Sequence, residues 1–339
     1  MRLRFTGLLL FTLLFLVSLS AVSAHSPLSP QQNESLETAY LITDPMKSWA
    51  IYGELHEGGK AQYYRLDLEQ GKTLQASLFI PTFKQGSFTP RLVVMGPGIA
   101  SRDKVPTFVE TPGEVGVRLL ELQPINRATY EPFTPSSFYE LAEISLDAPA
   151  TGTYYLVVFE PYRGGRYGLA VGYEERFGLE EWILIPIFAI GIHEWEGQSI
   201  AFILVPMELT LIIGFGVILW KRHAAAQTLF GLMGVLASLL YLGSGFMMLV
   251  QMSLALAATS IDRSAFLTLV LALLPILFGL AILRISSSPE TVTKGRRALL
   301  AILGVLGLFT WSGLLVGPLL SLVASLVPIR KPATPSPKP

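Results

Sequence analysis

Two histidines could hold a metal in the first part of the chain. His25 follows Ala24 in "AVSAHSPLSP" and would begin the mature protein if a leader were removed after Ala24. A free amino group beside an imidazole can chelate copper, provided that further nitrogen ligands complete the site. His56 and His193 are the other histidines before the apolar half. No His-x-His or Met-rich run accompanies them, so copper at His25 and His56 stays an alternative to a simple leader end and an exposed loop residue.

The stretch "GIHEWEGQS" (191–199) contains part of a zinc-protease signature. Such a helix needs His-Glu-x-x-His, because two histidines four residues apart lie on one face and bind zinc together. Gly197 occupies the position of the second histidine. We therefore interpret this stretch as a polar connection before the first apolar span.

Glu208 is a carboxyl group inside the apolar stretch "IAFILVPMELTLIIGFGVILW" (200–220). An ionisable side chain at the centre of a bilayer costs about 3 kcal/mol on insertion and is by default a functional hypothesis. It could handle a proton or a cation, or it could form an interhelical hydrogen bond. No other apolar stretch carries a charged side chain at its centre, which favours a structural role over transport.

Other signatures of chemistry are few. "NES" (33–35) is a sequon that would allow glycosylation of Asn33 in a host with the machinery. The sequence contains no Gly-x-x-x-x-Gly-Lys-Ser/Thr phosphate loop, no dinucleotide fingerprint and no Gly-x-Ser-x-Gly nucleophile elbow. Nothing in it nominates an enzyme.

Composition separates an acidic half from an apolar half. Apolar residues make up 51% of the 339 residues and charged residues only 15%. Residues 25–180 carry 13 Lys and Arg against 19 Asp and Glu, a balance of −6. An acidic outer domain argues against a nucleic-acid partner, because phosphate binding needs concentrated Lys and Arg. The chain has no cysteine, which excludes disulfides and thiolate metal sites.

The N-terminus has the pattern of a secretory signal peptide. Arg2 and Arg4 precede an apolar run, and the small residues of "AVSA" follow it. We predict a signal peptide over 1–24, a polar segment over 25–37, and export of the domain that follows.

Four apolar stretches in the second half are long enough to cross a membrane, which takes roughly 20 helical residues. They are residues 200–220, 229–250, 265–285 and 298–328. The last has 31 residues, so we expect tilt or a kink at Pro318.

Charge placement sets the predicted orientation. Lys221 and Arg222 follow the first stretch, and Lys294, Arg296 and Arg297 precede the fourth. Because positive residues favour the cytoplasmic side, these loops lie inside and the N-terminal domain outside, with membrane lipid as a partner. The disordered tail 329–339 is then external.

Small residues recur in the apolar stretches and allow helices to approach closely. This spacing permits either packing within one chain or a homo-oligomer. The residues are Gly243, Gly245, Gly304, Gly307 and "GLLVG" (313–317).

Short alternating runs between residues 38 and 175 predict an extracytoplasmic, all-β sandwich. The predicted strands are residues 63–68, 74–79, 91–95, 138–145, 153–159 and 166–173. Residues 96–137 are rich in Pro and Gly and indicate long loops with one strand at 115–120. Loops on a rigid scaffold are where binding usually resides. Residues 176–199 are predicted to be a linker with an interfacial segment, "EEWILIPIFAI" (180–190).

Two parts of this domain carry a family resemblance. "GELHEGGKAQYYRLDLEQGKTLQASLF" (53–79) resembles the opening of the prokaryotic pre-peptidase C-terminal (PPC-type) domain, and "APATGTYYLVVFEPYRGGRYGLAVGY" (148–173) is similar to its closing strand pair. The central residues 96–137 do not fit and look like an insertion. The resemblance implies a β-sandwich that serves as a binding or accessory module of an exported protein. It places no calcium ligand on this chain.

Together these features predict a multi-pass protein of a prokaryotic cell membrane, with an outer β-sandwich joined to a four-helix bundle. The expected function is non-catalytic binding or sensing at the outer face, with an envelope protein or polymer as partner. The alternative is a transport-associated or copper-handling protein that uses Glu208 or His25.

Overall fold

The structure is a computed structural model of the chain, and it describes residues 26–28, 32–83, 86–125, 127–176, 178–260, 263–287 and 293–327. The predicted signal peptide, His25 and the predicted tail lie outside the described residues. The chain divides into a β unit and a helical unit, and the boundary falls within one helix, α2 (Leu179–Trp195). Residues 191–198 and 255–262 belong to the β unit, and residues 182–190 to the helical unit.

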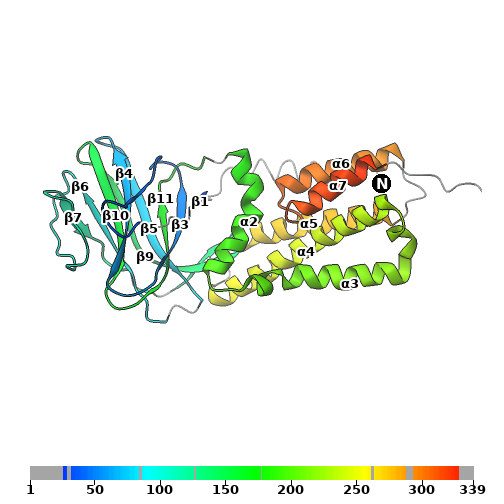
Figure 1. Cartoon of the computed structure of the whole chain (residues 1–339), viewed down its shortest axis with the longest axis horizontal. Coiled ribbons are helices and arrows are strands. Elements are labelled where there is room, and N and C mark those ends of the chain that lie inside the picture. Colours follow the sequence, from blue (N-terminus) through cyan, green and yellow to red (C-terminus); the bar gives the residue numbers. More distant parts are fainter. Residues whose placement is uncertain are drawn as a thin grey trace, which may run out of the picture. The chain divides into compact units, whose positions relative to one another are not determined.

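The β unit contains two mixed sheets (Figure 1). One has the strand order β1-β3-β11-β5-β9-β8 and the other β2-β4-β10-β6-β7. The strands are β1 (Ser26–Leu28), β2 (Tyr40–Leu41), β3 (Trp49–Leu55), β4 (Lys60–Leu68), β5 (Thr73–Pro81), β6 (Arg91–Gly96), β7 (Gly116–Leu119), β8 (Thr129–Glu131), β9 (Ser136–Asp147), β10 (Gly152–Glu160) and β11 (Gly165–Val171). Two pairings are parallel, β1 with β3 and β2 with β4.

A core between the sheets takes every second side chain of the central strands. Leu92 and Val94 of β6 pack there with Leu156 and Val158 of β10, and Leu169 of β11 packs against them from the other sheet. This is the period of two that a strand imposes on its side chains. The hydroxyl groups of Tyr64 and Tyr167 lie 2.5 Å apart within this core, and the Tyr167 hydroxyl also donates to Gln62 Oε1, so both buried phenols have partners.

The outer face of the five-stranded sheet is covered as well. Val93 of β6 and Val157 and Phe159 of β10, the residues between those of the first core, pack with Phe108 and Val109. The run "RLVVM" is apolar without alternation because β6 is buried on both faces. The segment predicted as an insertion thus folds back over the sheet and gives it a second core.

The predicted strands are confirmed, with shifted ends, and the strand at 115–120 is β7. Four further strands, β1, β2, β3 and β8, were not predicted. β3 was not predicted because buried and exposed side chains do not alternate along it: the neighbouring residues Ala50 and Ile51 are both buried. β8 has three residues and lies within the Pro-rich segment.

Among the residues that the structure describes, three helices, all in the helical unit (Figure 1), are long and apolar enough to cross a membrane. They lie within α3 (Ile200–Ala226), α4 (Leu229–Ala258) and α5 (Ala265–Ser286). They match the first three predicted spans. The backbone of α3 leaves helical geometry at Arg222, next to the predicted cytoplasmic loop.

The fourth predicted span, 298–328, is not one continuous helix. The stretch forms α6 (Lys294–Phe309) and α7 (Val316–Leu326), with 16 and 11 residues. Trp311, Leu314 and Leu315 have positive φ angles between them, so the chain turns there and not at Pro318. The guanidinium of Arg297, near the start of α6, donates to the carbonyls of Ser325 and Val327 at the end of α7. The two helices therefore form a hairpin whose ends lie together.

The polar groups at the tip of this hairpin have partners. Ser244 of α4 accepts a 2.8 Å hydrogen bond from the amide of Gly313. Tyr241 donates to the carbonyl of Leu303 at 2.9 Å, and the hydroxyls of Thr310 and Ser312 lie 2.9 Å apart. Buried backbone and hydroxyl groups need hydrogen-bond partners, and these contacts supply them.

Candidate functional site

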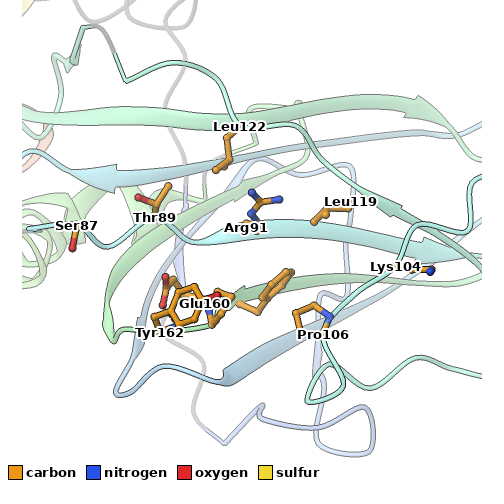
Figure 2. A pocket seen from close by; sticks show the side chains of 11 residues that line it. Ser87, Thr89, Arg91, Lys104, Pro106, Leu119, Leu122, Glu160 and Tyr162 are labelled. Carbon is orange, nitrogen blue, oxygen red and sulfur yellow. Dashed lines mark hydrogen bonds between the residues drawn. The ribbon is translucent and has the colours of Figure 1, made fainter.

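The segment between β6 and β8 lines an open cavity of about 570 Å³ in the β unit (Figure 2). The lining combines charged, hydroxyl and apolar side chains from β6, β10 and their loops: Ser87, Thr89, Arg91, Lys104, Pro106, Leu119, Leu122, Phe159, Glu160, Pro161 and Tyr162. Four of these residues lie within 96–137, the segment expected to carry binding. A cavity with an apolar floor and a few polar groups is the usual form of a ligand site.

Two cations stand in this lining without a counterion. Arg91 begins β6 and lies in Figure 2 between Thr89 and Leu119, while Lys104 comes from the loop after β6. Both residues are exposed. Neither takes part in an ion pair with any residue that the structure describes. In a domain with an excess of acids, their charges are available to a ligand.

Glu160 and Tyr162 form another part of the lining. Glu160 is nearly buried, and its Oε2 accepts hydrogen bonds from the backbone amides of Tyr162, at 2.6 Å, and of Arg163. Its Oε1 accepts no bond from the described residues. Tyr162 is 86% exposed and offers its ring to solvent, where a flat apolar face could stack on it.

Hydrogen bonds fix the loop that carries Lys104. The two oxygens of Asp103 accept from the hydroxyl of Ser101, at 2.7 Å, and from the amide of Leu119, at 2.9 Å. These bonds, that of Ser101 above all, lower the pKa of Asp103. Beyond the loop, the amide of Glu110 donates to the hydroxyl of Tyr63 at 2.7 Å. These bonds tie the segment that carries Lys104 to Leu119, and both residues belong to the cavity lining.

A second group of ionisable side chains in the β unit is buried. His193 and Glu196 are 3% and 7% exposed. The imidazole Nδ1 lies 2.9 Å from Glu196 Oε2, and Glu196 Oε1 accepts from the amide of Ser137 at 3.4 Å. The indole of Trp195 donates to the carbonyl of Gly53 at 3.0 Å and packs edge-on against Tyr52. We call Tyr52, Glu131, His193 and Glu196 the buried cluster.

The cluster raises the pKa of two of its members. Burial, with a smaller contribution from Glu196, raises the pKa of the Glu131 carboxyl to about 7, although hydrogen bonds from Thr134 oppose the shift. The residue as a whole is partly exposed, so its carboxyl is the enclosed part. Burial, then Glu131 and Glu196, raise the pKa of Tyr52. Hydrogen bonds and burial thus tie His193 and Glu196 into the β unit.

The predicted metal ligands are not brought together. His56 is an exposed residue between β3 and β4, as expected, and His25 lies outside the described residues. His193 pairs with Glu196 and not with another histidine. The described part of the chain contains no group of three His, Asp or Glu side chains that could hold a metal ion. The stretch 191–199, interpreted as a polar connection, is in fact helical to Trp195 and buries its His and second Glu.

Asn33 and Glu208, two further residues singled out in the sequence, differ in solvent exposure. Asn33 is 1% exposed, and its Nδ2, the atom that a glycan would occupy, donates to the carbonyl of Tyr63 at 3.2 Å. Glycosylation there stays a prediction that would require modification before folding. Glu208 lies on α3 and is exposed.

The sequence did not single out Arg91, Lys104, Glu160 or Tyr162. Arg91 and Tyr162 flank apolar strands, "RLVVM" and "TYYLVVF", and a charged or aromatic residue at a strand end is a common pattern. Only the fold shows that these two strands are neighbours, with Leu156 opposite Val94. Glu131 and Glu196 are 65 positions apart, and no local pattern connects them.

No family model matches the chain, and no curated protein is similar to it.

Proposed function

We propose that the protein is a membrane-anchored binding or sensing protein whose β unit holds an acidic ligand in the cavity lined by Arg91 and Lys104. The observation that carries this proposal is the pair of exposed cations without counterions in a pocket of an otherwise acidic domain. The described residues form no ion pair with either cation, and the carboxylate in the same lining, Glu160, accepts hydrogen bonds from backbone amides instead. The role is non-catalytic.

The lining favours an acidic saccharide as the ligand. Arg91 and Lys104 would pair with carboxylates, because charge-assisted hydrogen bonds are the strong ones. Glu160 Oε1 and the hydroxyls of Ser87 and Thr89 match sugar hydroxyl groups, and the exposed ring of Tyr162 offers a surface for the flat face of a sugar ring. A polymer of the cell envelope with uronic-acid units has this chemistry.

The orientation that we propose places the β unit outside and three spans, α3 to α5, across a prokaryotic cell membrane. Basic residues support it: Lys221, Arg222 and Arg284 lie at the ends of α3 and α5 that would face inward. Because the α6–α7 hairpin returns to the side from which it enters, the tail would lie inside and not outside. Its Arg330, Lys331 and Lys338 then obey the positive-inside rule as well.

The PPC-type resemblance and the copper-handling alternative differ in how well they agree with this proposal. The resemblance to PPC-type domains fits a binding role on an exported β domain, and it remains a prediction. A copper-handling role has less support, because the described residues contain no group of three His, Asp or Glu side chains that could hold a metal ion, and His25 lies outside them.

Calorimetric titration of the full chain in detergent with oligogalacturonate tests the proposal. We expect saturable binding that weakens as salt rises, because exposed charges are screened over about 8 Å at physiological ionic strength. The matched control is the same oligosaccharide with its carboxyls methyl-esterified, which should bind weakly or not at all. Equal binding of both would contradict the role of the cations. Binding of oligoglutamate but not of oligogalacturonate would replace the saccharide by an acidic peptide.

A further inference from the structure

We infer that the ligand of the pocket is a zwitterionic saccharide, with an unacetylated amino sugar beside the acidic unit, and that Glu160 and Tyr162 bind its ammonium group. Both residues belong to the cavity lining, and we call them the amine subsite. This assignment rests on the proposed function, in which Arg91 and Lys104 hold the acid groups, and it adds a second charge to the ligand.

One carboxylate oxygen in the lining has no partner among the residues that the structure describes. Glu160 is 6% exposed, and its Oε2 accepts from the backbone amides of Tyr162, at 2.6 Å, and of Arg163. Its Oε1 accepts no bond from a described residue, yet it is not fully enclosed. This oxygen therefore opens onto the cavity that Glu160 lines. The two amides hold the carboxyl group in place, and backbone N–H groups bond most strongly to an ionised carboxylate.

Cations on the two neighbouring strands do not neutralise Glu160. Lys60 is its partner in the pairing of β4 with β10, but the Lys60 ammonium lies 4.0 Å from Glu34 and 3.6 Å from Glu57. Arg91 begins the strand on the other side, β6, and forms no ion pair with a described residue. The carboxylate thus stays available to a cation of the ligand.

An aromatic ring adjoins this carboxylate. The amide of Tyr162 bonds to Glu160, and its ring, which is 86% exposed, lies beside the Glu160 side chain in Figure 2. An ammonium group matches both parts, because a carboxylate accepts its N–H donors and the face of an aromatic ring attracts its positive charge.

Binding of an acidic ligand makes this second charge important. The ligand displaces water from Glu160 Oε1, and a carboxylate that is enclosed without a donor costs free energy. A sugar hydroxyl supplies one neutral hydrogen bond, whereas an ammonium group supplies a charge-assisted bond and balances the charge. A ligand with acid groups alone also brings further negative charge to Glu160. The combination of Arg91 and Lys104 with Glu160 in one cavity therefore favours acid and amine groups on the same ligand.

A matched pair of oligosaccharides tests the amine subsite. A hyaluronan oligosaccharide, in which uronic acid alternates with N-acetylglucosamine, is the acetylated probe, and the same oligosaccharide after N-deacetylation carries free amines. In calorimetry with the full chain in detergent, the free-amine form should bind about tenfold more tightly than the acetylated form, although its net negative charge is smaller. Equal affinity, or tighter binding of the acetylated form, would overturn the inference.

Variants assign the preference to its residues. Glu160→Gln keeps an acceptor for the backbone amides but lacks the charge, so the ratio of the two dissociation constants should fall to about one. Tyr162→Leu keeps an apolar side chain without the aromatic face and should lower the ratio about threefold. Glu143→Gln, an exposed acid on β9 outside the lining, should keep the wild-type ratio. A ratio that survives in Glu160→Gln, or is lost equally in Glu143→Gln, would overturn the inference. Should Glu160→Gln not fold, an unchanged ratio in Tyr162→Leu, whose side chain is exposed, would overturn it.

Binding of oligogalacturonate separates failure of the amine subsite from failure of the proposed function. Saturable binding of oligogalacturonate with equal binding of the two hyaluronan forms would overturn the amine subsite alone. No saturable binding of oligogalacturonate or of either hyaluronan form would overturn both.

Discussion

Ionisable side chains gather at two places in the β unit, and the two differ in whether the charges have partners. In the pocket, Arg91 and Lys104 are exposed and form no ion pair with a residue that the structure describes. In the buried cluster, His193 and Glu196 are enclosed and bonded to each other. Polar side chains that bond to each other inside the fold stabilise it, whereas we expect exposed cations without such partners to be open to a ligand. Changes in the cluster should therefore alter stability, and changes in the pocket should alter binding.

Removal of Glu196 should have the largest effect on stability. In Glu196→Ala, the imidazole of His193, the amide of Ser137 and the amide nitrogen of Gln198 lose their acceptor. Breaking a buried pair in this way costs about 3 kcal/mol. Hydrogen exchange of the strands in the full-length protein measures the loss. Glu194→Ala is the matched control, because Glu194 is exposed on the same segment, and an equal effect of both variants would contradict the structural role of the cluster.

The stability of the β unit should depend on pH through Glu131. Its pKa is about 7 in the folded state, above its usual value of 4.5, so the folded state binds the proton more tightly. The stabilisation is therefore complete below pH 4.5 and is lost as pH rises through 7. The free energy of unfolding should fall by at most about 3 kcal/mol over this window.

The pH profile of thermal unfolding of the full chain in detergent checks this prediction. Glu131→Gln should flatten the profile, because the amide does not titrate. Glu143→Gln, an exposed acid on β9, should leave it unchanged. A wild-type profile that rises between pH 5 and pH 7 would contradict the assigned sign.

Loss of the Tyr162 ring should weaken ligand binding without changing stability. The ring is 86% exposed and makes no aromatic contact among the described residues, so Tyr162→Ala removes little that holds the fold. If the ring stacks on a sugar, the dissociation constant for oligogalacturonate should rise about tenfold. Tyr162→Phe keeps the ring and should bind as the wild type does. A loss of binding in both variants would point to the hydroxyl instead of the ring.

A smaller effect should follow from loosening the loop that carries Lys104. Asp103→Ala removes the acceptors of Ser101 and Leu119, and Lys104 then samples more positions. We expect a rise of about threefold in the dissociation constant. Ser145→Ala changes an exposed residue on β9 away from the cavity. Its dissociation constant for the ligand should equal that of the wild type and is the value for comparison.

The sequence anticipated features that depend on local pattern. Alternating runs located the strands from β4 to β11 other than β8, and apolar length located α3, α4 and α5. The turn between α6 and α7 could not be predicted from hydropathy, because its residues are apolar on average. Its polar groups, such as the amide of Gly313, have hydrogen-bond partners inside the protein. The pocket and the buried cluster could not be predicted, because residues distant in sequence build them. Arg91 and Tyr162 line one cavity because β6 pairs with β10, which places Phe159 opposite Arg91.

Reversal of the pocket cations tests the central claim most directly. Calorimetry with oligogalacturonate on the full chain would compare Arg91→Glu, Lys104→Glu and the double variant with Lys72→Glu, an exposed residue outside the cavity. Each pocket variant should raise the dissociation constant about tenfold and the double variant about 100-fold, while thermal stability stays at the wild-type value. Binding by the double variant that equals binding by Lys72→Glu would contradict the assignment of this pocket as the ligand site.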